Sequence, residues 1–340
     1  MRKSFSIFIL PWLIIFSLAS VVTAAPASSF SDLAGHWAER EIEELAAMGV
    51  VRGDPTGRVR PDEPITRAEF LALLLRAEDL EPDPATVAAG SCPFTDVSSD
   101  RWYYAYVWQG WKKGIVKGTG GNLFGPEQLI RREELTAMML RASDGIAVTG
   151  SETPPFQDVP ADWWSYPYVR TAWQAGIVRG KTAAEFAPTE LATRAQAMVF
   201  IRRLLEAETN AATLPADDRL IQLVEGFSQQ IRATLNAGYP YNWSEVQAAL
   251  VGRARDAFEP FRQYYDLRGA SGEKLELGPL EIKNSVIKKR EHLAVVSSEV
   301  GFDLTATGPA GKTTTTFTLR YTFFLRRQNQ QWKIFDFSQQ

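Results

Sequence analysis

Hydrophobic and polar positions follow three different patterns along the chain. An apolar run, broken by Pro11, extends from Phe5 to Val22. Between residues 30 and 206, apolar residues recur every three or four positions, which is typical of amphipathic helices. After Gly272, apolar and polar residues alternate with a period of two, which is typical of β-strands. These patterns predict a short apolar leader, a helical region and a C-terminal region that ends in a sheet.

The apolar leader has the features of a secretory signal peptide. Arg2 and Lys3 precede the run, and Val22 and Ala24 place small residues at positions −3 and −1 of a cleavage site. We therefore expect residues 1–24 to be removed and the mature chain to be secreted. The alternative is an uncleaved membrane anchor, which Pro11 within the run disfavours. Since no second apolar run is long enough to span a bilayer, we expect no membrane association after cleavage.

Three copies of one pattern fill the helical region. Each copy opens with Phe-x-Asp, at Phe30, Phe94 and Phe156, and then carries five identical residues at constant offsets. The five positions, each given for the first, second and third copy in turn, are Trp37, Trp102 and Trp164; Gly49, Gly114 and Gly176; Gly53, Gly118 and Gly180; Pro61, Pro126 and Pro188; Arg67, Arg132 and Arg194. Such regularity identifies an internal repeat.

One repeat reads as a helix, a short loop and a second helix. Ala38, Ile42 and Leu45 share one helical face, and Gly49 stands where a left-handed residue would end that helix. Residues 66–69, Thr-Arg-Ala-Glu, form a capping box that opens the second helix. A helix pair of this size buries too little apolar surface alone, so the three repeats must pack together. Residues 81–93 and 143–155 are expected to be the linkers.

The repeated motifs resemble the S-layer homology domain. The resemblance rests on Phe-x-Asp, the Trp, the Gly-Ile-Val-x-Gly of residues 114–118 and 176–180, the Pro, and the Ile-Thr-Arg-Ala-Glu of residues 65–69. It implies an all-α, pseudo-threefold bundle with units at 30–80, 94–142 and 156–206. It also implies non-covalent binding to pyruvylated secondary cell-wall polysaccharide and display on the cell surface of bacteria, mostly Gram-positive ones.

The repeated arginines are the first candidates for glycan binding. Each stands at the start of a predicted helix, where unpaired N–H groups and the positive end of the dipole favour anions. A guanidinium there suits the carboxylate of a pyruvate ketal. The alternative is a solvated arginine inside a capping box. The second copy reads Arg131-Arg132-Glu133-Glu134, which loses the threonine cap, and its carboxylates are expected to neutralise the added charge. We therefore expect Arg67 and Arg194 to be the better sites.

Other residues at constant offsets are secondary candidates. In the family, the aligned tryptophan lies near the ligand groove, although tryptophans at helix starts are also common core residues. The aspartates suit sugar hydroxyls or, alternatively, bond their own turn. A basic residue precedes the second glycine of each copy. These candidates are Trp37, Trp102 and Trp164; Asp32, Asp96 and Asp158; Arg52, Lys117 and Arg179.

The C-terminal region, residues 213–340, is predicted to be an α+β domain. A helix is expected over 215–236, and a second runs from Ser244 through Phe261 with Pro260 as a kink or end. Strands are expected from Leu280, over 292–305, over 313–326 and over 331–337. Helices followed by a long antiparallel meander resemble the nuclear transport factor 2-like cone fold, a curved sheet around helices that often leaves a pocket.

Composition and charge narrow the function further. The formal net charge of −3 becomes −5 without the leader, which argues against nucleic-acid binding. A single cysteine and two histidines give no internal disulfide, no spacing typical of a metal site and no expected cofactor. Acid–base candidates in the C-terminal domain are His292, Glu299, Asp303 and Tyr321, and none stands at a diagnostic spacing.

Two functions remain open from the sequence. The first is a non-catalytic envelope protein whose repeats anchor a C-terminal binding or self-associating domain. The alternative is a wall-anchored enzyme or small-ligand receptor with its site in the cone pocket. A lattice-forming S-layer subunit is disfavoured because the C-terminal region is a single small domain.

Overall fold

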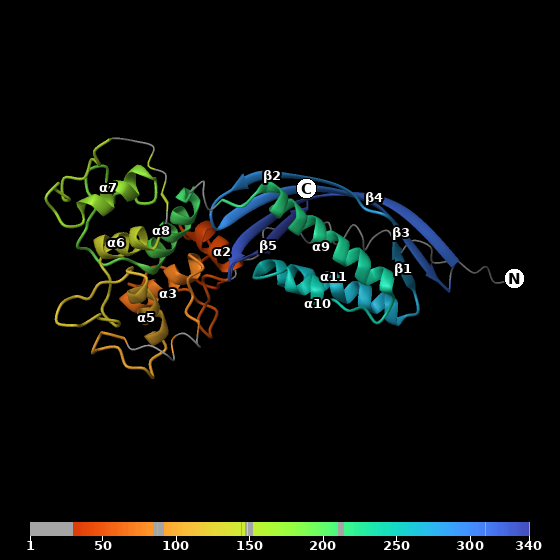
Figure 1. The fold of residues 1–340 in the computed structure, drawn as a ribbon, viewed down its shortest axis with the longest axis horizontal. Coiled ribbons are helices and arrows are strands. Elements are labelled where there is room, and N and C mark those ends of the chain that lie inside the picture. The colour runs from red at the N-terminus through yellow and green to blue at the C-terminus, as the bar shows by residue number, and fades with distance from the viewer. Residues whose placement is uncertain are drawn as a thin grey trace.

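The computed structural model describes residues 30–339 except 84–86, 88–91, 144, 147, 149–151, 210–213 and 310. The predicted signal peptide, residues 1–24, lies outside the described residues. No helix within the described ranges is both long and apolar enough to cross a membrane. Figure 1 shows a helical part next to an elongated part in which a curved sheet arches over helices.

The helical part consists of three helix pairs, as the repeats predict. The pairs are α2 (Glu39–Ala47) with α3 (Arg67–Ala77), α5 (Tyr104–Lys112) with α6 (Arg132–Ala142), and α7 (Tyr166–Gln174) with α8 (Arg194–Ala207). Just after the first helix of each pair, Gly49, Gly114 and Gly176 take φ values of 76°, 73° and 73°. A side chain is strained at such φ values, so these glycines end the helices.

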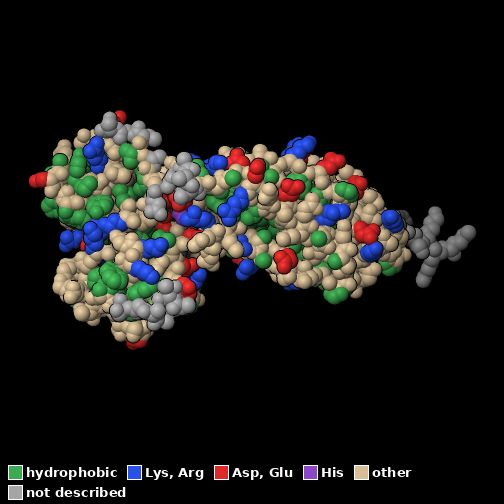
Figure 2. Space-filling model, in the orientation of Figure 1, with side chains coloured by type: hydrophobic (Ala, Val, Ile, Leu, Met, Phe, Trp, Pro, Cys, Tyr) green, Lys and Arg blue, Asp and Glu red, His purple; other side chains and the backbone are tan. Residues whose placement is uncertain are grey.

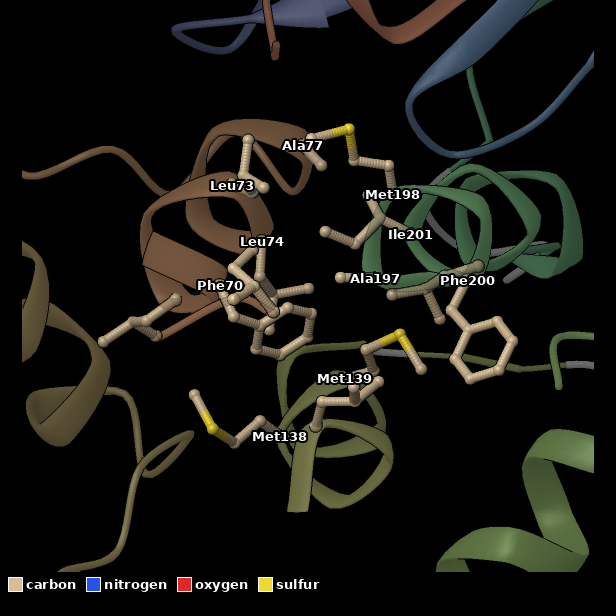
Figure 3. Packing of buried hydrophobic residues seen from close by; sticks show 14 of the residues in the cluster. Phe70, Leu73, Leu74, Ala77, Met138, Met139, Ala197, Met198, Phe200 and Ile201 are labelled. Carbon is tan, nitrogen blue, oxygen red and sulfur yellow. The ribbon is translucent and has the colours of Figure 1, made fainter. Parts of the chain in front are cut away.

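The three pairs interlock around a shared core. Side chains of α3, α6 and α8, among them Phe70, Met139 and Ile201, point toward one another (Figure 3). Each outer helix packs against the inner helix of another repeat: α5 on α3, α7 on α6, and α2 on α8. The contact between α2 and α8 closes the ring, so no repeat completes its core alone.

Main-chain hydrogen bonds mark the pseudo-threefold axis. The N–H of Ile130 donates to the carbonyl of Ile65 at 3.0 Å, and that of Ala192 donates to Ile130 at 2.9 Å. The N–H of Ile65 completes the cycle by donating to Ala192 at 3.1 Å. Each residue precedes the cap of an inner helix, so the axis runs beside the three helix starts.

The C-terminal domain is three helices followed by five antiparallel strands. The helices are α9 (Asp217–Ala237), α10 (Ser244–Ala248) and α11 (Arg253–Ala270), and the strands are β1 (Lys274–Leu277), β2 (Glu281–Lys289), β3 (Leu293–Gly308), β4 (Gly311–Gln328) and β5 (Gln331–Gln339). The sheet order is β1-β3-β4-β5. Strands β1 and β2 both pair with the same edge of β3, one after the other along its length. Lys274 of β1 pairs with Thr307, and Glu281 of β2 pairs with Gly301. Phe227 and Phe258 pack beneath the sheet, with Phe323 against Phe227. The predicted α+β architecture is confirmed.

One local prediction in this domain is wrong, and one strand was missed. The helix expected from Ser244 to Phe261 is split between α10 and α11. Pro260, expected as a kink or an end, lies inside α11 and does not end it. The break falls at Gly252, whose φ is 53°, where Leu250 bridges to Ile334 of β5. Strand β1 was not predicted, because four residues carry too short an alternation to be recognised.

The two parts dock through buried contacts. The Arg326 side chain of β4 is buried and donates to the carbonyl oxygens of Met48 and Arg76 in the first repeat. The N–H of Gln330 donates to the Asp79 carboxylate at 2.8 Å. Leu293 and Phe335 belong to the hydrophobic core of the helical part. The C-terminal domain therefore packs directly on the repeat bundle.

Candidate functional site: the junctions between repeats

The repeated arginines join neighbouring repeats. Nε of Arg67 donates to the carbonyl of Phe124 at 2.9 Å, and Nη1 donates to Oε1 of Glu134 at 3.1 Å. Both acceptors belong to the second repeat. The guanidinium also lies over the Phe124 ring, 5.0 Å from its centroid. Arg67 is therefore a link between two repeats rather than a solvated side chain.

The same link recurs around the ring. Arg132 donates to the carbonyl of Phe186 at 2.9 Å and to Oε1 of Gln196 at 3.1 Å, both in the third repeat. Arg194 donates to the carbonyl of Val59 and to Oε1 of Glu69 in the first repeat, both at 2.9 Å. Three equivalent junctions result.

The repeated aspartates hold the loop that each arginine contacts. Asp96 accepts from the N–H of Phe124 at 2.9 Å and of Gly125 at 2.7 Å. Asp158 binds Phe186 and Ala187 in the same way, and Asp32 binds Val59 and Arg60. The bonded N–H groups lie 27–29 residues further along the chain, so the aspartates do not bond their own turn as the alternative expected. They hold a loop in which Arg60, Gly125 and Ala187 all have positive φ values.

The N–H groups at the inner-helix starts are not unpaired, contrary to the expectation from the helix ends. The N–H of Arg67 donates to the carbonyl of Gln128 at 2.9 Å, and that of Ala68 to Pro126 at 3.0 Å. The other two junctions repeat both bonds. An anion at a junction would therefore be bound by side-chain cations rather than by these main-chain donors.

The three arginines differ in accessibility. Arg67 and Arg132 are buried, whereas the Arg194 side chain is 19% exposed. Burial lowers the pKa of Arg132 to about 10, which leaves it charged at neutral pH. Within the described part of the chain, Nη2 of Arg194 has no hydrogen bond, whereas Nη2 of Arg132 donates to the carbonyl of Arg179 at 3.1 Å. Arg194 is the arginine that a ligand reaches most easily.

Exposed aromatic and basic side chains accompany the junctions. Trp37, Trp102 and Trp164 are 61%, 54% and 48% exposed, so they are not core residues. Arg52, Lys117 and Arg179 are also exposed. Figure 2 shows basic side chains beside exposed apolar ones where the lobes of the helical part meet. Flat rings beside cations are groups that bind acidic sugars.

Trp37 connects to the Arg194 junction through a short chain of contacts. Its neighbour His36 pairs through Nε2 with Oδ1 of Asp62 at 3.2 Å. On either side of Asp62, the carbonyls of Pro61 and Glu63 accept from the N–H groups of Ala195 and Arg194. His36, which precedes Trp37, and the main chain of Arg194 thus contact the same loop.

The two carboxylates of the second capping box face in different directions. Glu134 pairs with Arg67 of the first repeat and also accepts from the N–H of Arg131, the added basic residue, at 2.9 Å. Glu133 accepts from Nε1 of Trp163 at 2.8 Å and Oγ of Ser165 at 2.9 Å. The sequence alone cannot show which repeat a carboxylate faces.

The C-terminal domain contains an apolar cavity of about 270 Å³ between its helices and sheet. Phe261, Tyr265, Phe302, Phe317 and Tyr321 are among its walls. Of the acid–base candidates, only Tyr321 lines the cavity, and burial raises its pKa. Its described lining includes no histidine and no carboxylate.

The other acid–base candidates lie outside this cavity. Glu299 pairs with Arg320 at 2.8 Å, and Asp303 accepts from Thr316 at 2.5 Å, both at exposed positions. His292 lies between the two parts of the molecule, 3.5 Å from Glu78. The candidates are therefore not assembled into one site.

Comparison with known proteins identifies the repeats. The S-layer homology domain family matches residues 29–71, 93–136 and 155–198. The chain is 32% identical over 186 residues to exoglucanase XynX of Acetivibrio thermocellus and 26% identical over 242 residues to the surface-layer 125 kDa protein of Lysinibacillus sphaericus. These alignments cover 54% and 70% of this chain, but only 17% and 19% of the relatives.

A solved structure also matches part of the chain. It is the putative calcium/calmodulin dependent protein kinase II association domain from Xanthomonas campestris, at 17% identity and a TM-score of 0.22, over 35% of this chain and 83% of that one. The nuclear transport factor 2-like resemblance stays a prediction. The repeats are identified by motif and by family match: the chain carries three S-layer homology domains, which place it at the cell surface.

Proposed function

We propose that the junctions between the repeats bind pyruvylated secondary cell-wall polysaccharide non-covalently, and that the C-terminal domain is a non-catalytic module displayed from that anchor. The observation that carries the proposal is the Arg194 junction. Its guanidinium is partly exposed and has a donor without a hydrogen bond among the described residues, and exposed Trp37 follows His36, which contacts the same loop. A ketal carboxylate would accept from the guanidinium while the ring packs on a sugar face.

Variants must separate ligand binding from folding, because Arg194 also joins two repeats. We therefore choose the exposed residues Arg52 and Trp37, whose replacement by Ala removes no bond of the arginine ring. Matched controls are Arg40→Ala, an 80% exposed arginine on α2, and Trp111→Ala, a 42% exposed tryptophan outside the repeat pattern.

The measurement is cosedimentation of the mature chain with purified cell-wall sacculi over a range of concentrations. Loss of one charge-assisted hydrogen bond corresponds to a weakening of about tenfold or more, so Arg52→Ala should lower affinity by that order. Trp37→Ala removes the packing of the ring on a sugar face and should lower affinity by about threefold to tenfold. The two controls should bind like the unmodified chain. Equal binding by all five proteins would contradict the proposed site.

A second candidate function rests on the C-terminal cavity. Its aromatic walls and the absence of carboxylates from its described lining favour binding of a small apolar molecule over acid–base catalysis. Leu319→Trp should fill part of the cavity and reduce the fluorescence of bound 8-anilinonaphthalene-1-sulfonate, a dye whose aromatic rings bind apolar cavities. Ile287→Trp, at a 61% exposed position of β2, is the control. An unchanged dye signal in Leu319→Trp would show that the dye does not enter this cavity.

A further inference from the structure

Three potential metal ligands meet where the repeat bundle contacts the C-terminal domain. Glu78 follows α3, Glu208 follows α8, and His292 precedes β3. Nε2 of His292 lies 3.5 Å from Oε2 of Glu78 and 3.8 Å from Oε2 of Glu208. One ligand atom from each residue falls within 4.8 Å of the other two. All three residues are buried, with Glu208 fully inaccessible.

Some polar atoms of Glu208 and His292 have no hydrogen-bond partner among the described residues. Within the described residues, neither carboxylate oxygen of Glu208 has a hydrogen-bond partner, and Nδ1 of His292 also has none. Buried polar groups are almost always hydrogen-bonded, and a buried charge without a partner is strongly destabilising. Atoms of this kind, pointing into one small space, indicate a missing partner.

The surrounding charges leave the cluster short of positive charge. Four buried carboxylates meet here, those of Glu78, Asp79, Glu208 and Glu291. Two guanidiniums face them: Arg327 lies 3.8 Å from both Asp79 and Glu291, and Arg326 donates to main-chain carbonyls. If all four carboxylates are ionised, they exceed the two guanidiniums by two charges, which a divalent cation would balance.

The distances fit ligands around a shared ion better than direct hydrogen bonds. A hydrogen bond from Nε2 to a carboxylate would measure about 2.7–3.2 Å. Two ligands bound tetrahedrally at about 2.1 Å from one ion lie about 3.4 Å apart. The observed separations of 3.5 and 3.8 Å are close to the second value.

We propose that Glu78, Glu208 and His292 bind one divalent transition-metal ion of the Zn²⁺ or Mn²⁺ class. Imidazole with carboxylates suits these ions, whereas Ca²⁺ and Mg²⁺ prefer oxygen ligands alone. Without a cation, burial raises the pKa of Glu208 to about 7. A proton shared between the carboxylates of Glu208 and Glu78 is therefore the alternative to a metal ion, since it also reduces their mutual repulsion. The sequence gives no metal motif because the ligands stand far apart in the chain.

The three ligands come from the end of the first repeat, the residue that follows α8 of the third repeat, and the C-terminal domain. An ion bound by all three would hold the C-terminal domain in one orientation on the bundle and keep the ends of α3 and α8 together. This role is independent of glycan binding at the repeat junctions.

The test uses the untagged mature chain, treated with chelator and then titrated with Zn²⁺ or Mn²⁺ by calorimetry. We expect one ion per chain and a rise in melting temperature on binding. Glu208→Gln and His292→Gln should each weaken binding by at least about tenfold. Glu206→Gln and His36→Gln are matched controls, since Glu206 pairs with Arg202 and Lys288 at the same interface and His36 is the other histidine.

Glu208→Gln also shows whether weaker metal binding by a variant results from a loss of folding. Because it removes one of the crowded carboxylates, the metal-free variant should melt no lower than the metal-free unmodified chain. No stoichiometric binding by the unmodified chain would overturn the proposal and leave the shared proton as the explanation. Binding that is equally strong in all four variants would also overturn it.

Discussion

Nη1 of Arg132 donates to the amide oxygen of Gln196 at 3.1 Å, where the two equivalent arginines donate to carboxylates. Arg67 has Glu134 and Arg194 has Glu69 at this position. The ring of three arginines is therefore uneven: the junction between the second and third repeats holds a buried cation with a neutral partner.

Gln196→Glu should stabilise the bundle. The variant replaces a neutral hydrogen bond to Arg132 by a charge-assisted one and restores an acidic third residue to the capping box of α8, together about 1 kcal/mol. Chemical denaturation should show a higher midpoint with an unchanged slope. The reverse exchange, Glu69→Gln at the Arg194 junction, should lower the midpoint by a similar amount. A lower midpoint for Gln196→Glu would contradict this account of the ring.

Asp32 should make folding sensitive to acid. Burial raises the pKa of its carboxyl, but hydrogen bonds from the N–H groups of Val59 and Arg60 outweigh burial and hold the pKa below its usual 3.8. Because the folded-state value is the lower one, the stabilisation is present above the unfolded-state pKa and is lost as the pH falls through the folded-state value.

The check compares unfolding free energies of the unmodified chain and Asp32→Asn from neutral to acidic pH. The difference should stay constant above about pH 5 and shrink below about pH 4. Asp62→Asn, at an 84% exposed carboxylate, should show no comparable trend. A constant difference down to the lowest pH would mean that the Asp32 charge does not hold this turn.

Gly252 should be essential for docking of the C-terminal domain. A Cβ atom at this position would lie 1.7 Å from the carbonyl oxygen of Ala47, and its φ is 53°. Gly252→Ala should therefore lower the unfolding free energy by about 1–3 kcal/mol, since the backbone of either part must shift.

Gly226 within α9 provides the matched control. A Cβ there would meet nothing within 4 Å, so Gly226→Ala should stabilise the chain by about 0.5–1 kcal/mol through helix propensity. Thermal unfolding of both variants gives the comparison. A Gly252→Ala variant as stable as the unmodified chain would contradict the close approach of the two parts.

The sequence predicts the features that depend on short stretches of chain. The left-handed glycine at Gly49 and the capping box at Thr66 and Glu69 are both confirmed, because neighbouring residues determine them. The alternating run of β3 is also confirmed to within a few residues. The break at Gly252 was not predicted, because it depends on Leu250 bridging to a strand more than 80 residues later.

The site was harder to predict because its contacts cross from one repeat to another. The sequence shows Arg67 at a helix start but not that Phe124 and Glu134 of the next repeat accept its hydrogen bonds. It likewise cannot bring Glu78, Glu208 and His292 together. Which glycan binds, and at which junction, stays a prediction.

The most direct test of the proposed anchor is cosedimentation of the mature chain with sacculi before and after removal of the pyruvate ketal groups. The account predicts strong binding to native sacculi and a loss of about tenfold or more after removal, because the arginines and neighbouring cations would lose their carboxylate partner. Binding that is unchanged after removal would contradict recognition of the ketal at the repeat junctions.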